Sequence, residues 1–308
     1  MKQNNTPRFI TDLSELTNDF DTFFLDMYGV LWDGSNFYPN VLNMLKYLKD
    51  NKKKIYILTN MTALKPSFVS SKEKKGLIQG VHYDDVITSG DVCAAALRQG
   101  LFEQLAQKEA YSYYVLGGAN PALFEDVSAH ETKNIENADI LYLSSVQTEA
   151  QEDNFDHFLP VLNRALERNL PAVCANPDRF FMRGGKMLPA QGAVGKWYEE
   201  HGGHVVYFGK PNSVAFEFAL QQTQSDPTRT VMVGDMLETD ILGGHSAGLK
   251  TVLITQTGIT GYLLQQGQTL TDIYQRQHVV PDYVKNKFGE NILLERFFLM
   301  KGVNQYGI

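Results

Sequence analysis

The chain has 308 residues and a net charge of −7, with 43% hydrophobic and 20% charged residues. This composition is typical of a globular protein with one large or two modest domains. An acidic chain lacks the basic face that nonspecific binding to nucleic acid or to anionic membranes requires, so we expect neither partner. No apolar run approaches the length that crosses a bilayer, and residues 1–10 contain no apolar signal core.

The two cysteines, Cys93 and Cys174, lie far apart in the sequence and in no metal-binding spacing. A disulfide framework is therefore not indicated, and we expect a cytoplasmic protein in which both thiols fill apolar space. The chain shows no internal repeat and no low-complexity segment.

Short apolar runs alternate with helical spacing in the first third of the chain. Residues 23–25 form an apolar run that predicts a strand buried on both faces, and Asp26 follows it directly. Further strands are predicted at residues 55–60 and 86–89. Helices are predicted at residues 13–20, 41–48 and 66–75, and from Asp91, as the N-cap, to about residue 105.

The pattern starts afresh near residue 111. Strands are predicted at residues 113–116, 138–144 and 171–174, a helix at residues 154–168 and a turn at residues 183–186. We interpret residues 107–190 as an α/β domain that is inserted into a core formed by residues 1–106 and 191–308.

Core-like features return after this insert. The predicted elements are a helix at residues 194–201, a strand at 205–208, a helix around 216–220, a strand at 230–233, a helix at 239–247 with Gly248 beyond it, and a strand at 250–255. A loop and weak helix at 258–273, a short strand at 281–284 and a helix at 291–300 complete the chain. The alternation of strands and helices predicts an α/β fold with a doubly wound, Rossmann-like parallel sheet.

Polar side chains follow four of the predicted strands. They are Asp26, the pair Thr59 and Asn60, Lys210, and Asp235 with Asp240 five residues on. Because the carboxyl ends of parallel strands meet at one edge of a sheet, we expect these side chains to lie together. A carboxylate nucleophile, a hydroxyl, an ammonium and hard oxygen ligands for Mg²⁺ can grip one phosphoryl group. Taken singly, Asp26 is more often a turn or cap residue and Lys210 a surface lysine.

Four segments, in this order, resemble the four motifs of the haloacid dehalogenase-like superfamily. They are Asp26-Met27-Tyr28-Gly29-Val30-Leu31, Leu58-Thr59-Asn60, Gly209-Lys210-Pro211 and Gly234-Asp235-Met236-Leu237-Glu238-Thr239-Asp240. The insert resembles the α/β cap of the NagD-like branch, which includes phosphoglycolate and pyridoxal phosphatases. Residues 175–178 and 209–212 match that branch as well, and the resemblance covers roughly residues 20–290.

The resemblance implies a role for each matched residue. Asp26 matches the nucleophile that becomes an aspartyl-phosphate, and Lys210 matches the lysine that holds nucleophile and phosphate. Thr59 and Asn60 match the phosphate-binding second motif. The residues that match the family's Mg²⁺ site are Asp26, the carbonyl of Tyr28, Asp235 and, behind them, Asp240.

Tyr28 departs from the family pattern. Phosphatases of the family carry an aspartate two residues after the nucleophile, as acid for the leaving group and base for water, and this chain has Tyr28 there. A free tyrosine has a pKa of about 10, so it is a poor base at neutral pH but is able to donate a proton. Haloacid dehalogenases proper share the Asp-x-Tyr-Gly pattern and need no metal, whereas Asp235 and Asp240 resemble a retained metal site.

We therefore predict a Mg²⁺-dependent phosphatase of a small phosphorylated metabolite, such as a sugar phosphate or phosphoglycolate, with an aspartyl-phosphate intermediate. Tyr28 leaves two alternatives open, a metal-independent dehalogenase-type hydrolase and a protein that binds phosphate ligands with weak turnover. A homodimer is also left open. The cap would choose the substrate, which the sequence does not name.

Overall fold

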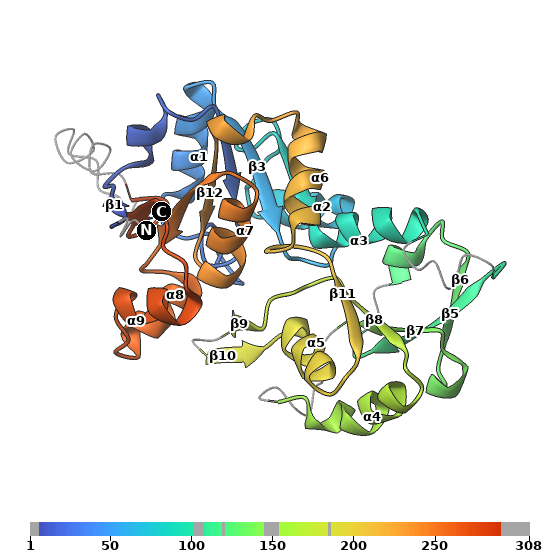
Figure 1. Ribbon diagram of the computed structural model, residues 1–308. Helices are drawn as coiled ribbons and strands as arrows, with labels where there is room; N and C mark the ends of the chain where they lie inside the picture. The colour runs from blue at the N-terminus through green and yellow to red at the C-terminus, as the bar shows by residue number, and fades with distance from the viewer. Residues whose placement is uncertain (1–5, 101–107, 119–120, 145–153, 184–185, 291–308) are drawn as a thin grey trace. The chain divides into compact units, whose positions relative to one another are not determined.

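The computed structural model describes residues 6–100, 108–118, 121–144, 154–183 and 186–290 (Figure 1). The chain forms two compact units. Unit 1 comprises Met1–Ile57, Glu73–Asp85 and Ser225–Ile308, and unit 2 comprises Leu58–Lys72 and Val86–Gln224. Each unit is assembled from segments that are distant in the sequence. The helix predicted at residues 291–300 lies outside the described residues.

A seven-stranded sheet has the strand order β1-β14-β13-β12-β2-β3-β4. Its strands are β1 (Arg8–Phe9), β2 (Thr22–Leu25), β3 (Lys54–Thr59), β4 (Asp85–Thr88), β12 (Thr230–Gly234), β13 (Lys250–Ile254) and β14 (Tyr283–Lys285). The neighbouring pairs from β1 to β3 are all parallel. The α/β fold with a doubly wound parallel sheet, predicted from the alternation of strands and helices, is confirmed.

Strands β12 and β2 are neighbours in the interior of this sheet. Every residue of both strands is buried, as expected for parallel strands that are covered on both faces. In β2, Leu25 lies opposite Val233 of β12 on one side and opposite Ile57 of β3 on the other. The N–H of Asp26 donates to the carbonyl of Val233 at 2.9 Å, which continues the ladder one residue past β2. Asp26 is therefore fixed at the carboxyl end of its strand, beside the end of β12.

Helices of unit 1 follow from local patterns to different degrees. Helix α1 (Val41–Asp50) buries residues at positions i, i+3, i+4 and i+7, as predicted. A π-helical segment, Leu237–Ile241, leads directly into α7 (Leu242–Ser246). The helix predicted at residues 13–20 is only a 3-10 turn, Leu13–Leu16. The segment predicted as a loop and then a weak helix, residues 258–273, instead contains α8 (Gly258–Gln265) and the first part of α9 (Leu270–Gln277).

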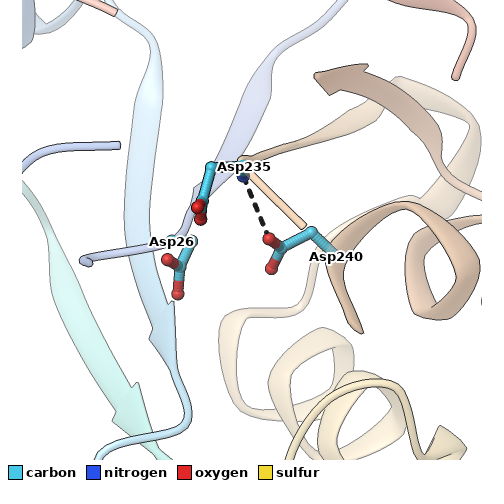
Figure 2. Close-up of side chains that lie close together, drawn as sticks. All are labelled: Asp26, Asp235 and Asp240. Atoms are coloured by element: carbon cyan, nitrogen blue, oxygen red, sulfur yellow. Dashed lines mark hydrogen bonds between the residues drawn. The ribbon is translucent and has the colours of Figure 1, made fainter. Parts of the chain in front are cut away.

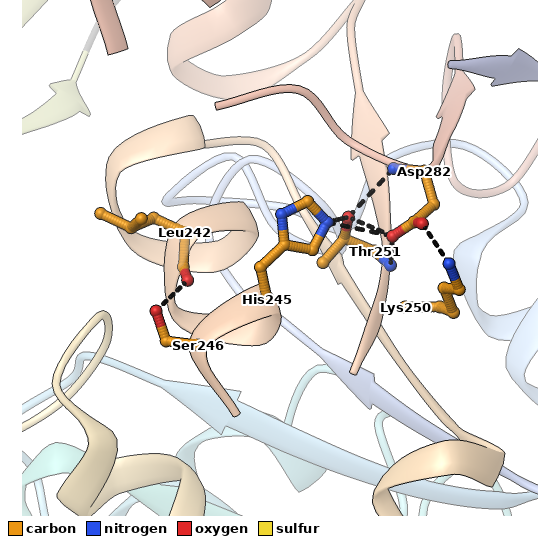
Figure 3. A network of polar contacts seen from close by, with 6 residues as sticks. All are labelled: Leu242, His245, Ser246, Lys250, Thr251 and Asp282. Atoms are coloured by element: carbon orange, nitrogen blue, oxygen red, sulfur yellow. Dashed lines mark hydrogen bonds and ion pairs between the residues drawn. The ribbon is translucent and has the colours of Figure 1, made fainter. Parts of the chain in front are cut away.

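A polar network joins α7 and β13 to the residue that precedes β14 (Figure 3). The Asp282 Oδ2 atom accepts from the N–H of Thr251 at 3.0 Å and lies 3.0 Å from Nε2 of His245. The Asp282 Oδ1 atom accepts from Nζ of Lys250 at 2.6 Å. One carboxylate thus holds three segments at the amino end of β13.

Lys285 in β14 is completely buried. Its ammonium donates to the carbonyl of Thr11 at 2.6 Å and to that of Glu290 at 2.8 Å. These contacts satisfy a buried charge with main-chain oxygens, and they fasten the N-terminal segment beside β1 and β14.

Unit 2 contains a second parallel sheet with the order β11-β8-β7-β5-β6. Its strands are β5 (Tyr111–Leu116), β6 (Ala129–Thr132), β7 (Ile140–Leu143), β8 (Pro171–Cys174) and β11 (His204–Tyr207). Helices α4 (Leu159–Glu167) and α5 (Gln191–Glu200) share its core, in which Leu162 and Val194 pack with Leu141. Strand β9 (Phe180–Arg183) pairs with β10 (Lys186–Pro189) in an antiparallel arrangement. The middle of the turn predicted at residues 183–186 lies outside the described residues.

Strand β11 belongs to this sheet, where Val206 lies opposite Val173 of β8. The predicted boundary at residue 191 places α5 and β11 in the core instead. We therefore propose that the inserted domain extends at least to Tyr207. Its predicted start at residue 107 lies outside the described residues and stays a prediction.

Among the described residues of unit 2, two further α-helices are α3 (Ser89–Arg98) and α6 (Ser213–Thr223), and α2 (Lys65–Glu73) ends at the boundary with unit 1. The prediction that Asp91 is the N-cap of α3 is wrong, because Thr88 occupies that position. The Thr88 hydroxyl accepts from the N–H of Asp91 at 3.0 Å, and the Asp91 carboxylate accepts from the N–H of Thr88 at 3.4 Å. The two residues form a reciprocal capping box.

Cys93 and Cys174 are both buried free thiols, as predicted. Burial raises the pKa of each thiol. Within the described part of the chain, no helix combines the length and the apolar character that crossing a bilayer requires.

Candidate active site

Three carboxylates of unit 1 converge at the carboxyl ends of β2 and β12 (Figure 2). Asp26 follows β2, Asp235 follows β12, and Asp240 lies in the π-helical segment. One oxygen from each lies within 4.8 Å of the other two. Their exposed fractions are 8%, 2% and 1%, so water screens their charges poorly. The structure therefore brings together three of the residues that were expected to meet at the sheet edge.

Main-chain amides fix the two aspartates of the Gly234–Asp240 segment. The Asp240 Oδ2 atom accepts from the N–H of Asp235 at 3.1 Å (Figure 2). It also accepts from the N–H of Met236 at 3.0 Å. The Asp235 Oδ2 atom accepts from the N–H of Ile259 at 2.6 Å. Asp240 therefore orients the backbone that carries Asp235, and the start of α8 orients the Asp235 side chain.

The chemistry of this cluster fits a divalent cation. Three ionised carboxylates in a buried space repel one another, and a bound cation offsets that repulsion. Carboxylate oxygens are the ligands that Mg²⁺ prefers. The pKa of the Tyr38 phenol is raised to about 12, mainly by burial and further by the negative charge of Asp235.

The turn after Asp26 is held by its own backbone. The carbonyl of Met27 accepts from the N–H groups of Leu31 and Trp32 at 3.0 and 2.9 Å. Gly29 has φ +84°, and a Cβ there would overlap the Asp235 carboxylate, so this turn requires glycine. The Tyr28 side chain, by contrast, is 38% exposed.

A second group of predicted residues is buried in unit 2. Thr59, Asn60 and Lys210 have exposed fractions of 3%, 4% and 1%. The Asn60 Nδ2 atom donates to the carbonyl of Lys210 at 2.9 Å, and the N–H of Lys210 donates to Asn60 Oδ1 at 2.8 Å. The same Nδ2 atom donates to Asp178 Oδ1 at 2.8 Å. Asn60 is thus a connector that fixes the backbone of Lys210.

The predicted site residues therefore form two groups, each within its own unit. Sequence reasoning missed several residues that hold these groups in place: Thr257, Ile259 and Thr260 in unit 1, and Asp178 as a partner of Asn60 in unit 2. A threonine followed by glycine shortly after β13, at Thr257 and Gly258, is a local signal for the first set.

The sequence pattern of the haloacid dehalogenase-like hydrolase family matches residues 20–248, and a second pattern, of HAD-like hydrolases, matches residues 207–290. The chain therefore belongs to the haloacid dehalogenase-like hydrolase family, and the predicted family is confirmed.

Relatives within the family narrow this assignment. An acid sugar phosphatase of Staphylococcus haemolyticus is 24% identical over 245 residues, which are 79% of this chain and 88% of that protein. A human glycerol-3-phosphate phosphatase is 28% identical over an alignment of 294 positions, which covers 87% of this chain and 88% of that protein. These relatives place the chain among the phosphatases of the family.

Solved structures share the fold. A haloacid dehalogenase-like hydrolase from Brucella suis 1330 has a TM-score of 0.76 at 23% identity, covering 90% of this chain and 98% of its own. NagD from Escherichia coli K-12 has a TM-score of 0.59 at 23% identity, covering 88% of this chain and 98% of its own. The fold is that of the NagD-like branch, as predicted.

Proposed function

We propose that the protein is a Mg²⁺-dependent phosphatase that hydrolyses a small phosphorylated metabolite, of the sugar phosphate or glycerol phosphate class, through an aspartyl-phosphate. The observation that carries the proposal is the convergence of Asp26, Asp235 and Asp240 within 4.8 Å at the ends of two adjacent strands. The names of the relatives, an acid sugar phosphatase and a glycerol-3-phosphate phosphatase, support the substrate class.

Asp26 is the proposed nucleophile. One of its carboxylate oxygens forms a bond to phosphorus while the bond from phosphorus to the leaving oxygen breaks, and the leaving oxygen takes up a proton. Water then attacks the acyl-phosphate, which releases inorganic phosphate and restores the Asp26 carboxylate. The hydrogen bond from Asp26 N–H to the Val233 carbonyl supports this role, because it holds the nucleophile at a fixed place on the sheet edge.

The residues proposed to hold Mg²⁺ are Asp26, the carbonyl of Tyr28 and Asp235. When bound, the ion offsets the repulsion between the Asp26 carboxylate and the anionic phosphate. Asp240 orients the Asp235 backbone through its two accepted N–H bonds. Tyr28 is the proposed proton donor to the leaving oxygen, a role that suits a phenol better than that of base for water.

Thr59, Asn60 and Lys210 are proposed to bind the phosphate. Strand β3 supports this role for Thr59, because Ile57 pairs with Leu25 and Thr59 follows two residues later on the same strand. The ammonium of Lys210 would offset phosphate charge, and the Thr59 hydroxyl would donate a hydrogen bond. We propose that the five-stranded domain of unit 2 acts as the cap that selects the substrate.

The test is a screen of phosphorylated metabolites with Mg²⁺ and with excess chelator. We expect phosphate release that depends on Mg²⁺ and disappears on chelation. The dehalogenase-type alternative, favoured by Tyr28, predicts turnover of 2-haloacids that survives the chelator. Tight binding of phosphate esters without any release would instead support a weakly catalytic binding protein.

Two further properties stay proposals. A cytoplasmic location is supported by the two free, buried thiols of Cys93 and Cys174. The homodimer that the sequence leaves open also stays a proposal, and sedimentation of the purified protein would test it.

A further inference from the structure

Four consecutive residues, Thr257–Thr260, contact both parts of the carboxylate site in unit 1. The Thr257 hydroxyl donates to the carbonyl of Gly29 at 2.5 Å. The N–H of Ile259 donates to Asp235 Oδ2 at 2.6 Å, and the Thr260 hydroxyl donates to the main-chain carbonyl of Asp235 at 2.6 Å. One short segment therefore forms hydrogen bonds with the turn after Asp26, with the Asp235 carboxylate and with the Asp235 main-chain carbonyl.

The N-terminus of α8 is capped by a residue that is distant in the sequence. Thr88 and Thr269, at the N-caps of α3 and α9, each accept a hydrogen bond from the amide three residues on. Thr257 occupies the same position before α8, but its hydroxyl donates to Gly29 instead of accepting from the helix. The amide of Ile259, in the first turn of α8, is satisfied by the Asp235 carboxylate. Asp235 thus caps α8 from 24 residues away.

This arrangement serves the carboxylate as well as the helix. The N-terminus of an α-helix carries partial positive charge, which favours an anion placed against its free amides. Gly258 has φ +62°, and a Cβ there would overlap the Asp235 carboxylate, as it would at Gly29. The Asp235 side chain is therefore packed between two glycine backbones and oriented by one amide.

We infer that Thr257 and Thr260 are positioning residues, which hold the Gly29 turn and Asp235 in the geometry that binds the metal. The inference rests on the proposed metal role of Asp235. The hydroxyl of Thr260 fixes the backbone of Asp235, and that of Thr257 fixes the turn that begins at the nucleophile. Neither residue touches the reacting atoms in this role.

The first experiment measures Mg²⁺ affinity by calorimetry. Thr260→Val keeps the shape of the side chain and removes the hydroxyl, and we expect it to weaken Mg²⁺ binding by about 10- to 100-fold, as loss of groups that orient metal ligands typically does. Thr257→Val should also weaken Mg²⁺ binding. Thr260→Ser restores a hydroxyl and should recover most of the affinity.

A matched control separates positioning from general stability. The buried Thr230 hydroxyl, at the start of β12, also donates to a main-chain carbonyl at 2.6 Å, that of Asp226. Thr230→Val should lower the melting temperature as Thr260→Val does, with Mg²⁺ affinity unchanged. Equal Mg²⁺ affinity in Thr260→Val and the parent, or equal loss in Thr230→Val and Thr260→Val, would overturn the inference.

A second readout needs no metal. In metal-free protein, Asp235→Ala removes the cap of α8, so hydrogen exchange at the Ile259 amide should become faster than in the parent. Unchanged exchange would show that Asp235 does not hold the start of α8, which removes the link through which Thr260 is inferred to position Asp235. If exchange rises as expected but the parent binds no Mg²⁺, the failure lies with the proposed metal site and the link between Asp235 and α8 stands.

Discussion

Asn60 and Lys210 are 150 residues apart in the sequence, yet the side-chain amide of Asn60 bonds the backbone of Lys210 in both directions. Both residues are buried, so water cannot take the place of either hydrogen-bond partner if the other is removed. The proposed phosphate-binding ammonium is therefore carried on a backbone that Asn60 fixes.

The first prediction is that Asn60→Ala lowers phosphatase activity and destabilises the protein. Removing the amide leaves the buried N–H and carbonyl of Lys210 without this partner, at a cost of about 1–3 kcal/mol in the free energy of unfolding. Urea unfolding and steady-state turnover measure the two effects. Asn212→Ala is the control, because the more exposed Asn212 donates to the neighbouring Gly209 carbonyl at 3.1 Å. Equal behaviour of the two variants would contradict the prediction.

Asp26→Asn is expected to abolish turnover while the fold persists. The amide has nearly the size of the carboxylate but lacks the anionic oxygen that attacks phosphorus, so we expect a loss of about 10³-fold or more. Steady-state phosphate release measures the loss, and circular dichroism checks the fold. Near-parental phosphatase activity in this variant would rule out an aspartyl-phosphate on Asp26.

Tyr28→Asp is expected to hydrolyse a generic phosphate ester faster than the parent, with unchanged Mg²⁺ dependence. A positioned acid–base group contributes about 10²- to 10⁴-fold to a rate, and a carboxylate takes a proton from water more readily than a phenol does. Tyr28→Phe keeps the ring and removes the hydroxyl, so a fall in its rate identifies the phenol as a proton donor. The measurements are turnover and a burst assay for phosphoenzyme. If Tyr28→Asp is no faster and no phosphoenzyme forms in either protein, Tyr28 does not stand in the place of the missing base, and the non-phosphatase alternatives gain support.

Gly258→Ala is expected to lose Mg²⁺ affinity, because the added methyl group occupies the space of the Asp235 carboxylate. Gly267→Ala is a matched control. Gly267 also has positive φ, +87°, but a Cβ there would meet no atom of the described residues within 4 Å. Both variants pay the backbone cost of a left-handed alanine, about 1 kcal/mol, and calorimetric titration with Mg²⁺ should separate them. Similar affinities would show that the site tolerates the displacement of Asp235.

The network around Asp282 predicts a loss of stability in acid (Figure 3). Burial alone would raise the pKa of Asp282, but hydrogen bonds from His245 and Lys250 and the charge of Lys250 outweigh burial and hold the pKa well below its usual range. A carboxyl whose pKa is lower in the folded state stabilises that state above its unfolded pKa of about 3.9, and the contribution disappears as the pH falls further.

Urea unfolding of the parent and of Asp282→Asn between pH 7 and pH 2 tests this expectation. The parent should be more stable than the variant by a constant amount above about pH 5, and the difference should shrink below about pH 4. A difference that does not change with pH would mean that Asp282 contributes through packing alone.

The carboxylate cluster was predictable because its signal is local. Asp26 and Asp235 each end a short apolar run, and a parallel sheet brings such ends to one edge. Asp240 lies five residues after Asp235, so one turn of helix is enough to place its side chain next to the Asp235 backbone. Short apolar runs that end in polar or glycine residues are typical of strands buried on both faces, so β2 and β12 could be expected from their residues.

Other features depend on contacts that no local pattern records. Residues 258–265 contain two glycines and gain their N-terminal cap from Asp235, so the segment resembled a loop when considered by itself. Strand β11 is an apolar run that would fit either sheet, and its pairing with β8 decides the matter. Thr88 and Asp91 are both good capping residues, and the backbone conformation of Thr88 selects it as the N-cap.

The buried ammonium of Lys285 sets a limit on how far the protein can be shortened. A truncation that removes Thr11 takes away a carbonyl 2.6 Å from a charge with no exposed surface, and it removes β1 from the edge of the sheet as well. A truncation that stops before Arg8 leaves both in place. Expression variants with the N-terminus cut beyond Thr11 should therefore aggregate, whereas replacement of Lys285 by methionine together with such a cut should recover part of the yield.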